Sequence, residues 1–502
     1  MRRINEESIG KLFMIGIYGT ELTKETRDVL AHIRPGSVIL FSRNIVGPEQ
    51  VRKLIDDISN FLGYKPIIAV DQEGGNVVRL KDGFNTLPSP MACAASRDVE
   101  LFKKAVYLTS LEMRAVGVDW NLAPVVDINV NPLNPVIGIR SFGDEPEIVT
   151  KFSNAFVEAS EEAGVATCLK HFPGLGSVSI DPHFDLPVIN KTIDELLNFD
   201  LVPFKNVKCN AWMPSHVYFP RIQKDGLPAS LSSEIVDIAR IRLGFDGVII
   251  VDDLLMGGTG KFTIEEKTLK AFNAGNDILT ICHEPEKQIR AFDNFCEYVN
   301  QNTDLKRRII ESLDRIENSF SKVKSHALFE HIDNGRFVRE AKGTIDELVR
   351  KSITIVNLRD YSLPLEEVDM VLTMLGVPGS PVVDQSLPVP QITQELSRLF
   401  NAYFEIISDT KLPEIEKVKG KKILLFTFDM YRSKSLVNFI KELDSYSKLL
   451  LIALKNPYDA FYSRNSIVLY GSSATHQRIL LDVLLGKVHA EGKLPVKPLE
   501  VV

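Results

Sequence analysis

The sequence predicts an α/β protein with two domains, an N-terminal (β/α)8 TIM-like barrel followed by an open α/β sandwich domain. Three observations lead to this prediction. The chain has 502 residues, which is too long for one ordinary core. Its first 325 or so residues repeat a short apolar run, a polar stop and an amphipathic segment, as in βα units around a parallel sheet. A second alternating block follows, with fewer strands than a barrel needs.

The strands of the barrel are predicted from apolar runs, and the helices from the amphipathic segments between them. The runs are a stretch near Leu12, then Ser37–Phe41, Pro66–Val70, Val118–Leu122, Val165–Leu169, Ala211–Pro214, Gly247–Val251 and Asp277–Ile281. Helices are predicted at Glu49–Phe61, Glu147–Ala163 and Ser233–Arg242, among others. We therefore place the barrel at residues 1–325.

The C-terminal block begins after a charged helical stretch, of which residues 326–350 are the predicted linker. Residues 351–502 form the second predicted domain. Its strands are predicted at Ile353–Asn357, Met370–Leu375, Lys422–Phe428, Leu449–Leu454 and Ile467–Tyr470. Five strands with intervening helices favour an open, doubly wound sheet. The segment GSPVVDQSLPVPQ, from Gly379, is predicted to be an exposed loop.

Composition excludes several classes of protein. The net charge of −7 gives no reason to expect nucleic acid or an anionic membrane as a partner. Five scattered cysteines without a CxxC pair indicate neither a disulfide framework nor a structural zinc site. The apolar stretch near the N-terminus is short and interrupted by glycine, so we expect neither a signal peptide nor a spanning helix, and a cytoplasmic location.

Polar residues follow four of the predicted strands directly. They are Asp71 after Val70, Lys170 and His171 after Leu169, Ser215 and His216 after Pro214, and Asp252 and Asp253 after Val251. In a barrel the carboxyl ends of the strands form the active-site face. Any one of these residues alone is more often a strand stop or a helix cap, but four sets on one face favour a site.

A long loop that begins at Lys170, KHFPGLGSVSIDPHFDLP, carries more chemistry than a connection needs. It contains His183 with Asp181 two residues earlier. If that carboxylate binds one ring nitrogen, the other nitrogen can act as a general acid and base. Asp252, at the end of a buried strand, is the candidate nucleophile toward an anomeric carbon, and we interpret Asp253 as a helix N-cap.

Further residues near these strand ends are candidates for binding polar substrate atoms. Asp71 and Arg79 lie in VDQEGGNVVRL, Arg140 in IGIRSFGDEP, and Lys170 and His171 open the long loop. Asp71 can accept hydrogen bonds from sugar hydroxyls, and the cationic residues can orient polar groups. A structural ion pair is an equal competitor for each of them.

Taken together, these segments resemble glycoside hydrolase family 3, specifically its β-N-acetylglucosaminidase branch. The matching segments are VILFSRNI, VDQEGGNVVRL, LAPVVDIN, GIRSFGDEP, CLKHFPGLGSVSIDPHFDLP, MPSHVYFP, PASLS and VDDLLMGG, and the C-terminal block matches through ALKNPYDAF and GKLPV. Two positions depart from the family pattern. Leu175 replaces a histidine between two glycines, and Asn76 replaces an arginine after EGG.

The resemblance implies a retaining exo-β-N-acetylglucosaminidase acting on peptidoglycan fragments or chitin oligosaccharides through a covalent glycosyl-enzyme. Asp252 would be the nucleophile and His183 the acid and base, paired with Asp181. The sugar would be bound by Asp71, Arg79, Arg140, Lys170 and His171. No metal or cofactor is implied, and the protein could form a homodimer. The second domain could serve packing, dimerisation or one wall of the site.

Three other functions stay open. A β-N-acetylglucosaminide phosphorylase could use the same residues, since a histidine acid leaves no anionic carboxylate beside incoming phosphate. A metal-dependent barrel hydrolase could use His171, Asp181, His183 and His216, although the chain has no HExxH. A non-catalytic glycan binder would need none of the acid–base groups.

Overall fold

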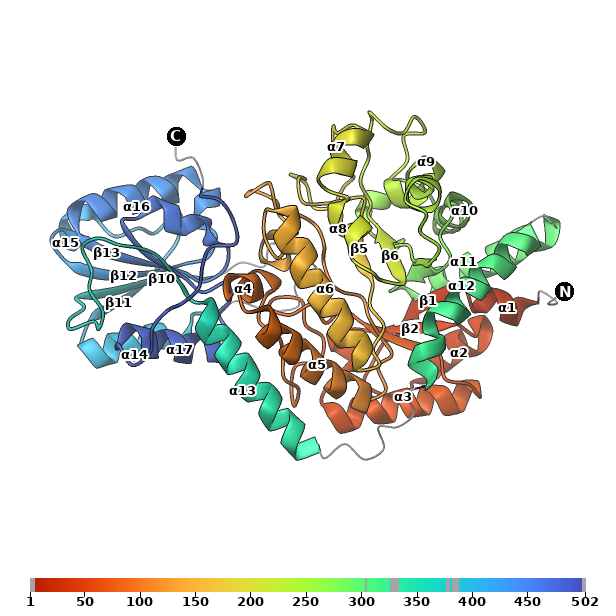
Figure 1. Cartoon of the computed structure of the whole chain (residues 1–502), viewed down its shortest axis with the longest axis horizontal. Coiled ribbons are helices and arrows are strands. Elements are labelled where there is room, and N and C mark those ends of the chain that lie inside the picture. Colours follow the sequence, from red (N-terminus) through yellow and green to blue (C-terminus); the bar gives the residue numbers. More distant parts are fainter. Residues whose placement is uncertain (1–4, 303–304, 326–333, 376–379, 382–387, 499–502) are drawn as a thin grey trace.

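The computed structural model describes residues 5–302, 305–325, 334–375, 380–381 and 388–498. It contains a barrel and a second α/β domain that lie next to each other, with the second domain at one end of the molecule (Figure 1). Within the described residues, no helix has both the length and the apolar character needed to cross a membrane.

The barrel is built from short parallel strands. They are β1 (Phe13–Gly16), β2 (Ser37–Leu40), β3 (Ile67–Val70), β4 (Trp120–Asn121), β5 (Leu169–Phe172), β6 (Ala211–Pro214), β7 (Val248–Ile249) and β8 (Leu279–Ile281). One sheet runs β4-β3-β2-β1-β8 and another β5-β6-β7. Parallel bridges Trp120–Ala166 and Ile250–Ile278 join the two sheets. The sheet therefore closes, and the predicted barrel is confirmed.

Helices follow the strands and form the outer layer. They are α1 (Glu6–Gly10), α2 (Lys24–Ile33), α3 (Pro48–Leu62), α4 (Pro90–Ala95), α5 (Val99–Ala115), α6 (Pro146–Glu162), α7 (Ile193–Asn198), α8 (Val202–Asn206), α9 (Ser233–Asp237), α10 (Ile264–Ala274), α11 (Pro285–Gln301) and α12 (Leu305–Ser325). Local sequence sets their ends. In α10, Thr263 and Glu266 form a capping box, and Gly275 ends the helix in the left-handed conformation.

Strand β5 differs from its prediction. The sequence placed the strand at Val165–Leu169, so that Lys170 and His171 would follow it. In the structure β5 begins at Leu169 and includes both residues. The reason is that their polar groups have partners inside the top of the barrel. The backbone N–H of His171 donates to Asp127 at 3.2 Å, and Lys170 bridges to Val125.

The second domain contains a six-stranded sheet in the order β11-β10-β12-β13-β14-β9. Its strands are β9 (Thr354–Leu358), β10 (Met370–Met374), β11 (Tyr403–Ile407), β12 (Lys422–Thr427), β13 (Lys448–Ala453) and β14 (Asn465–Val468), and its helices are α14 (Gln391–Phe400), α15 (Ile415–Val418), α16 (Lys434–Tyr446) and α17 (Ala474–Leu484). Only β9 is antiparallel among these strands. The predicted open α/β domain is confirmed, with β11 as a strand that the sequence did not predict.

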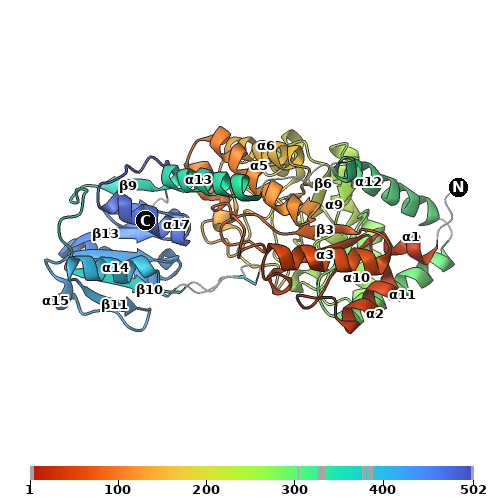
Figure 2. The same cartoon turned by 90° about the horizontal axis from the view of Figure 1, so that it is seen from below.

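Helix α13 (Asn334–Ser352) connects the two domains and packs on both. It packs against α5 and α4 of the barrel and also contacts α17 (Figure 1 and Figure 2). Lys351 near its end pairs with Asp98 at 2.6 Å. Of the predicted linker, residues 326–333 lie outside the described residues, and the rest belongs to this helix. The second domain is therefore fixed to the barrel over a long contact.

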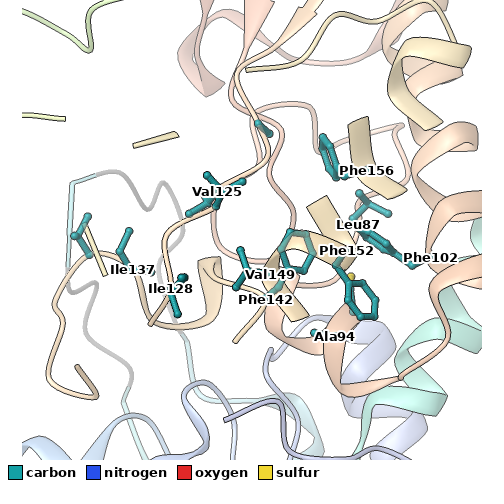
Figure 3. Close-up of a cluster of buried hydrophobic side chains, with 14 of the residues drawn as sticks. Leu87, Ala94, Phe102, Val125, Ile128, Ile137, Phe142, Val149, Phe152 and Phe156 are labelled. Atoms are coloured by element: carbon teal, nitrogen blue, oxygen red, sulfur yellow. The ribbon is translucent and has the colours of Figure 1, made fainter. Parts of the chain in front are cut away.

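An aromatic cluster is formed by side chains of α5, α6 and the loop that joins β4 to α6 (Figure 3). The ring of Phe102 lies 5.7 Å from that of Phe142 and 5.4 Å from that of Phe152. Phe142 follows Arg140 by two residues and is buried. Burying such side chains stabilises the fold by about 1.5–3 kcal/mol each, and here it also anchors the loop that carries Arg140.

Candidate active site

A cavity of about 260 Å³ opens at the carboxyl ends of the barrel strands. This is slightly below the size range of small-molecule sites, about 300–1,000 Å³. Seven of the eight predicted site residues line it: Asp71, Arg79, Arg140, Lys170, His171, His183 and Asp252. The eighth, Asp181, is buried and binds His183. The structure thus brings all eight to one place.

Asp252 lies three residues after the end of β7 and lines the cavity. Burial acts to raise its pKa, but the charges of His216, His171 and His183 in their protonated forms, together with the backbone N–H of Asp253, lower it on balance. Its Oδ1 also accepts the backbone N–H of Asp253 at 2.8 Å. Asp252 is therefore held as an anion near neutral pH, which is the form that a carboxylate nucleophile needs.

Asp253 does not cap a helix, contrary to the prediction. Its Oδ1 accepts the backbone N–H groups of Leu255 at 3.2 Å and of Cys282 at 3.1 Å. The carboxylate therefore ties the turn after β7 to the end of β8, because no regular helix begins at this turn and its free N–H groups need acceptors. Burial raises the pKa of Asp253 to about 6.

His183 and Asp181 form a hydrogen-bonded pair on the loop after β5. Nδ1 of His183 lies 2.6 Å from Oδ1 of Asp181. Burial acts to raise the pKa of Asp181, but hydrogen bonds from His183 and Ser380 lower it. The carboxylate thus stays ionised and binds the ring through Nδ1. Because His183 also lines the cavity, its other nitrogen, Nε2, is the one that can serve as a general acid.

A buried network of charged side chains lines the same cavity as Asp252. Lys170 Nζ lies 2.7 Å from both Asp71 Oδ1 and Glu73 Oε1. Arg140 binds Glu73 through two parallel hydrogen bonds of 2.8 and 2.9 Å. Burial acts to raise the pKa of Glu73, but Arg140 and Lys170 lower it well below its usual value. The network presents cationic donors of fixed orientation to the cavity.

Arg79 completes this network from the loop after β3. Its Nη2 lies 3.4 Å from Asp71 Oδ2, and its guanidinium lies over the ring of Phe41. Asp71 is thus shared between Arg79 and Lys170. Both ion-pair and ligand roles remain compatible with this geometry, since Asp71, Arg79 and Lys170 all line the cavity.

Two buried histidines are oriented by groups behind them. Nδ1 of His171 lies 2.7 Å from Asp127 Oδ2. His216 contacts the Ser230 hydroxyl at 2.6 Å through Nδ1 and the Asp253 carbonyl at 3.1 Å through Nε2. Burial lowers the pKa of His216 to about 4. His216 is therefore neutral at pH 7, donating from Nε2 and accepting at Nδ1.

Some residues of this site were not predicted. Glu73 and Asp127 both lie in segments quoted for the family resemblance, but nothing in their spacing distinguishes a buried counter-ion from a surface acid. Asp127 is buried and also accepts the backbone N–H of Leu175 at 2.6 Å. Leu175 itself lines the cavity. In this chain an apolar side chain therefore lies where the family pattern has a histidine.

The second domain contributes to the cavity. Pro381 lines it, and the hydroxyl of Ser380 is one of the groups that lower the pKa of Asp181. The segment from Gly379 was predicted to be an exposed loop. Residues 379 and 382–387 of that segment lie outside the described residues, but Ser380 is buried. The prediction of exposure is wrong for Ser380, because its side chain contacts Asp181 of the Asp181–His183 pair.

Among the residues that the structure describes, no group of three His, Cys, Asp or Glu side chains is arranged to hold a metal ion. His171, Asp181, His183 and His216, the set considered from the sequence, instead have protein partners: Asp127, each other, and Ser230.

Known proteins resemble the chain over both domains. The family description "Glycosyl hydrolase family 3 N terminal domain" matches residues 4–319. A beta-hexosaminidase of Thiobacillus denitrificans is 38% identical over 284 residues, covering 54% of this chain and 78% of the relative. A family 3 β-N-acetylglucosaminidase from Paenibacillus sp. str. FPU-7 covers all of both chains, with TM-score 0.88 and 28% identity.

A second solved structure resembles about two thirds of the chain. It is NagZ from Neisseria gonorrhoeae in complex with N-trifluoroacetyl-D-glucosamine, with TM-score 0.56 and 32% identity. The match covers 66% of this chain and 98% of that one. The Paenibacillus structure, in contrast, accounts for the second domain as well.

Proposed function

The chain belongs to glycosyl hydrolase family 3 and is a glycoside hydrolase, and from this premise we propose that it is a retaining exo-β-N-acetylglucosaminidase. Its substrates are glycans that end in N-acetylglucosamine, either peptidoglycan fragments or chitin oligosaccharides. The observation that carries the proposal is the hydrogen-bonded Asp181–His183 pair beside the same cavity as the ionised Asp252. The names of the beta-hexosaminidase and β-N-acetylglucosaminidase relatives support the choice of sugar.

In the first step Asp252 attacks the anomeric carbon as the bond to the leaving oxygen breaks. The imidazolium of His183 gives its Nε2 proton to that oxygen, so the aglycone departs as a neutral alcohol. Asp181 stabilises the positive ring through Nδ1. The product of this step is a glycosyl ester on Asp252 and a neutral His183.

In the second step the neutral His183 removes a proton from water through Nε2. The resulting oxygen nucleophile attacks the anomeric carbon and displaces Asp252, which returns to its carboxylate form. Two displacements give net retention of the β configuration. Asp71, Arg79, Arg140, Lys170 and His171 bind the sugar in this proposal, and Glu73 holds two of these cations in place.

A phosphorylase is the second candidate, and one observation favours it. The acid–base group is an imidazole, while its carboxylate partner Asp181 is buried behind it. The acid–base residue therefore carries no negative charge that would repel phosphate from the place where water attacks in the second step. Phosphate could thus take the place of water. Formation of N-acetylglucosamine 1-phosphate in phosphate buffer would identify this activity, whereas free N-acetylglucosamine identifies the hydrolase.

The proposal is tested with Asp252→Ala and an aryl β-N-acetylglucosaminide. The variant should keep its circular dichroism spectrum and lose about three orders of magnitude in kcat/KM. Wild-type-like turnover would refute the role of Asp252. NMR of the first-formed sugar should show the β anomer, and product analysis on muropeptides and chitin oligosaccharides should decide between the two substrate classes.

A further inference from the structure

Arg432 of the second domain holds a barrel loop at two successive carbonyl groups. Its Nη1 donates to the carbonyl of Leu133 at 3.1 Å, and its Nη2 donates to that of Asn134 at 2.8 Å. This loop leads from β4 to α6 and carries Arg140 six residues further on. One guanidinium thus spans the domain boundary and satisfies two acceptors, a geometry that its planar fork suits and an ammonium group does not.

The turn that presents Arg432 is itself held in place. The buried Asp459 carboxylate accepts the N–H groups of Met430 at 3.1 Å and of Tyr431 at 2.7 Å. The Tyr431 hydroxyl donates to the carbonyl of Pro132 at 2.8 Å. Arg432 follows directly in the chain, so its backbone is fixed before its side chain reaches the barrel. The turn therefore loses little further backbone entropy when Arg432 makes this contact.

From Asn134, hydrogen bonds continue to two residues of the cavity wall. The buried Asn134 side chain donates through Nδ2 to the carbonyl of Leu175 at 2.8 Å. Its Oδ1 accepts the N–H of Val136 at 3.0 Å, and the carbonyl of Val136 accepts Nη1 of Arg140 at 2.9 Å. Leu175 and Arg140 both line the cavity.

We propose that Arg432 is a positioning residue of the active site, through which the second domain sets the orientation of Arg140. The inference rests on the proposed function, because it takes Arg140 as a group that binds the terminal sugar. Without Arg432 the carbonyls of Leu133 and Asn134 would turn toward water, and the loop would lose its fixed path. Arg140 would then bind the sugar from a broader range of positions, at a cost in affinity.

Kinetics of Arg432→Ala in the full-length chain test this role. With an aryl β-N-acetylglucosaminide we expect KM to rise about tenfold and kcat to change less than about twofold. Arg432→Lys should recover part of the loss, since one ammonium can donate to the carbonyls but without the fork. Arg398→Ala, which removes an exposed arginine from α14 of the same domain, should leave KM unchanged.

A double-mutant cycle of Arg432→Ala with Asn134→Ala tests whether Arg432 acts through Asn134. Because Asn134 lies between Arg432 and the cavity, the double variant should be no worse than Asn134→Ala alone. Additive losses would overturn the inference, as would a KM for Arg432→Ala within twofold of the wild-type value. Should Arg432→Ala fail to fold, Arg432→Lys carries the same comparison.

Calorimetric titration with N-acetylglucosamine separates this inference from the proposed function. It measures sugar binding without turnover, and Arg432→Ala should weaken that binding by the same factor as it raises KM. Wild-type chain that binds the sugar but neither hydrolyses nor phosphorolyses the aryl glycoside would contradict the proposed function alone. Equal binding by wild-type and Arg432→Ala chains would contradict the inference alone.

Discussion

Oδ1 of Asp181 accepts two hydrogen bonds from His183, one from Nδ1 at 2.6 Å and one from the backbone N–H at 2.9 Å. A single oxygen therefore fixes both the ring and the backbone of the histidine. The His183 side chain is 22% exposed, while the Asp181 side chain is only 4% exposed. The buried Asp181 therefore orients the ring, while His183 remains accessible from the cavity.

Replacing the carboxylate of Asp181 should impair acid catalysis by His183. In Asp181→Asn the imidazolium loses its charged partner, so we expect kcat/KM to fall about 10²-fold, and further for aglycones with a high pKa. The measurement is a series of aryl glycosides that differ in leaving-group pKa. Asp185→Asn, on an exposed residue of the same loop, is the matched control. A loss that is independent of the leaving group would argue against an acid–base role for the pair.

Glu73 should matter more for stability than an exposed acid of the same type. In Glu73→Ala, Arg140 and Lys170 lose a buried anion, and breaking such a pair costs about 3–5 kcal/mol. Glu158→Ala removes an acid whose ion pair with Lys103, at 2.7 Å, is largely exposed, at a cost of less than about 1 kcal/mol. Urea denaturation measures both, and equal losses would contradict a buried structural role.

Asp253 should make stability depend on pH. Its folded-state pKa is raised to about 6 by burial, so its favourable contribution is present below about pH 4, the pKa of an unfolded Asp, and is lost as pH rises through 6. Asp253→Asn keeps Oδ1 as an acceptor and cannot ionise. Relative to wild type, it should gain about 2–3 kcal/mol of unfolding free energy between pH 4 and pH 7.

Denaturation at both pH values checks this prediction. The control is Asp56→Asn, a change at an exposed residue of α3, for which no comparable gain is expected because no buried charge is removed. A stability difference between Asp253→Asn and wild type that does not change with pH would show that the buried carboxyl does not ionise in this range.

The barrel could be predicted from the sequence because its strands fall in short apolar runs, several of which are followed directly by polar residues. β6 (Ala211–Pro214) was predicted with its observed ends. Lys170 and His171 were predicted to follow the strand but lie within β5, since sequence alone does not show that Asp127 offers an acceptor inside the barrel. β11 (Tyr403–Ile407) was missed because it is an edge strand in which Glu405 interrupts the apolar run.

Within the site, only contacts between residues close in sequence could be predicted. Asp181 and His183 are two residues apart, so their pairing could be inferred from spacing. Arg140 and Glu73 are separated by 67 positions, and their ion pair depends on how the loops after β3 and β4 approach each other. Ser380 and Arg432 reach the barrel from the second domain, and neither contact has any signature in the local sequence.

The most direct test of the mechanism is covalent trapping of the glycosyl-enzyme. A 5-fluoro-N-acetylglucosaminyl fluoride should react and then hydrolyse slowly, since the fluorine destabilises both oxocarbenium-like transition states while fluoride remains a good leaving group. Mass spectrometry should find one added fluorinated N-acetylglucosaminyl group, and peptide mapping should locate it on Asp252. A label on any other residue, or steady turnover of ordinary substrate by Asp252→Ala, would contradict the mechanism.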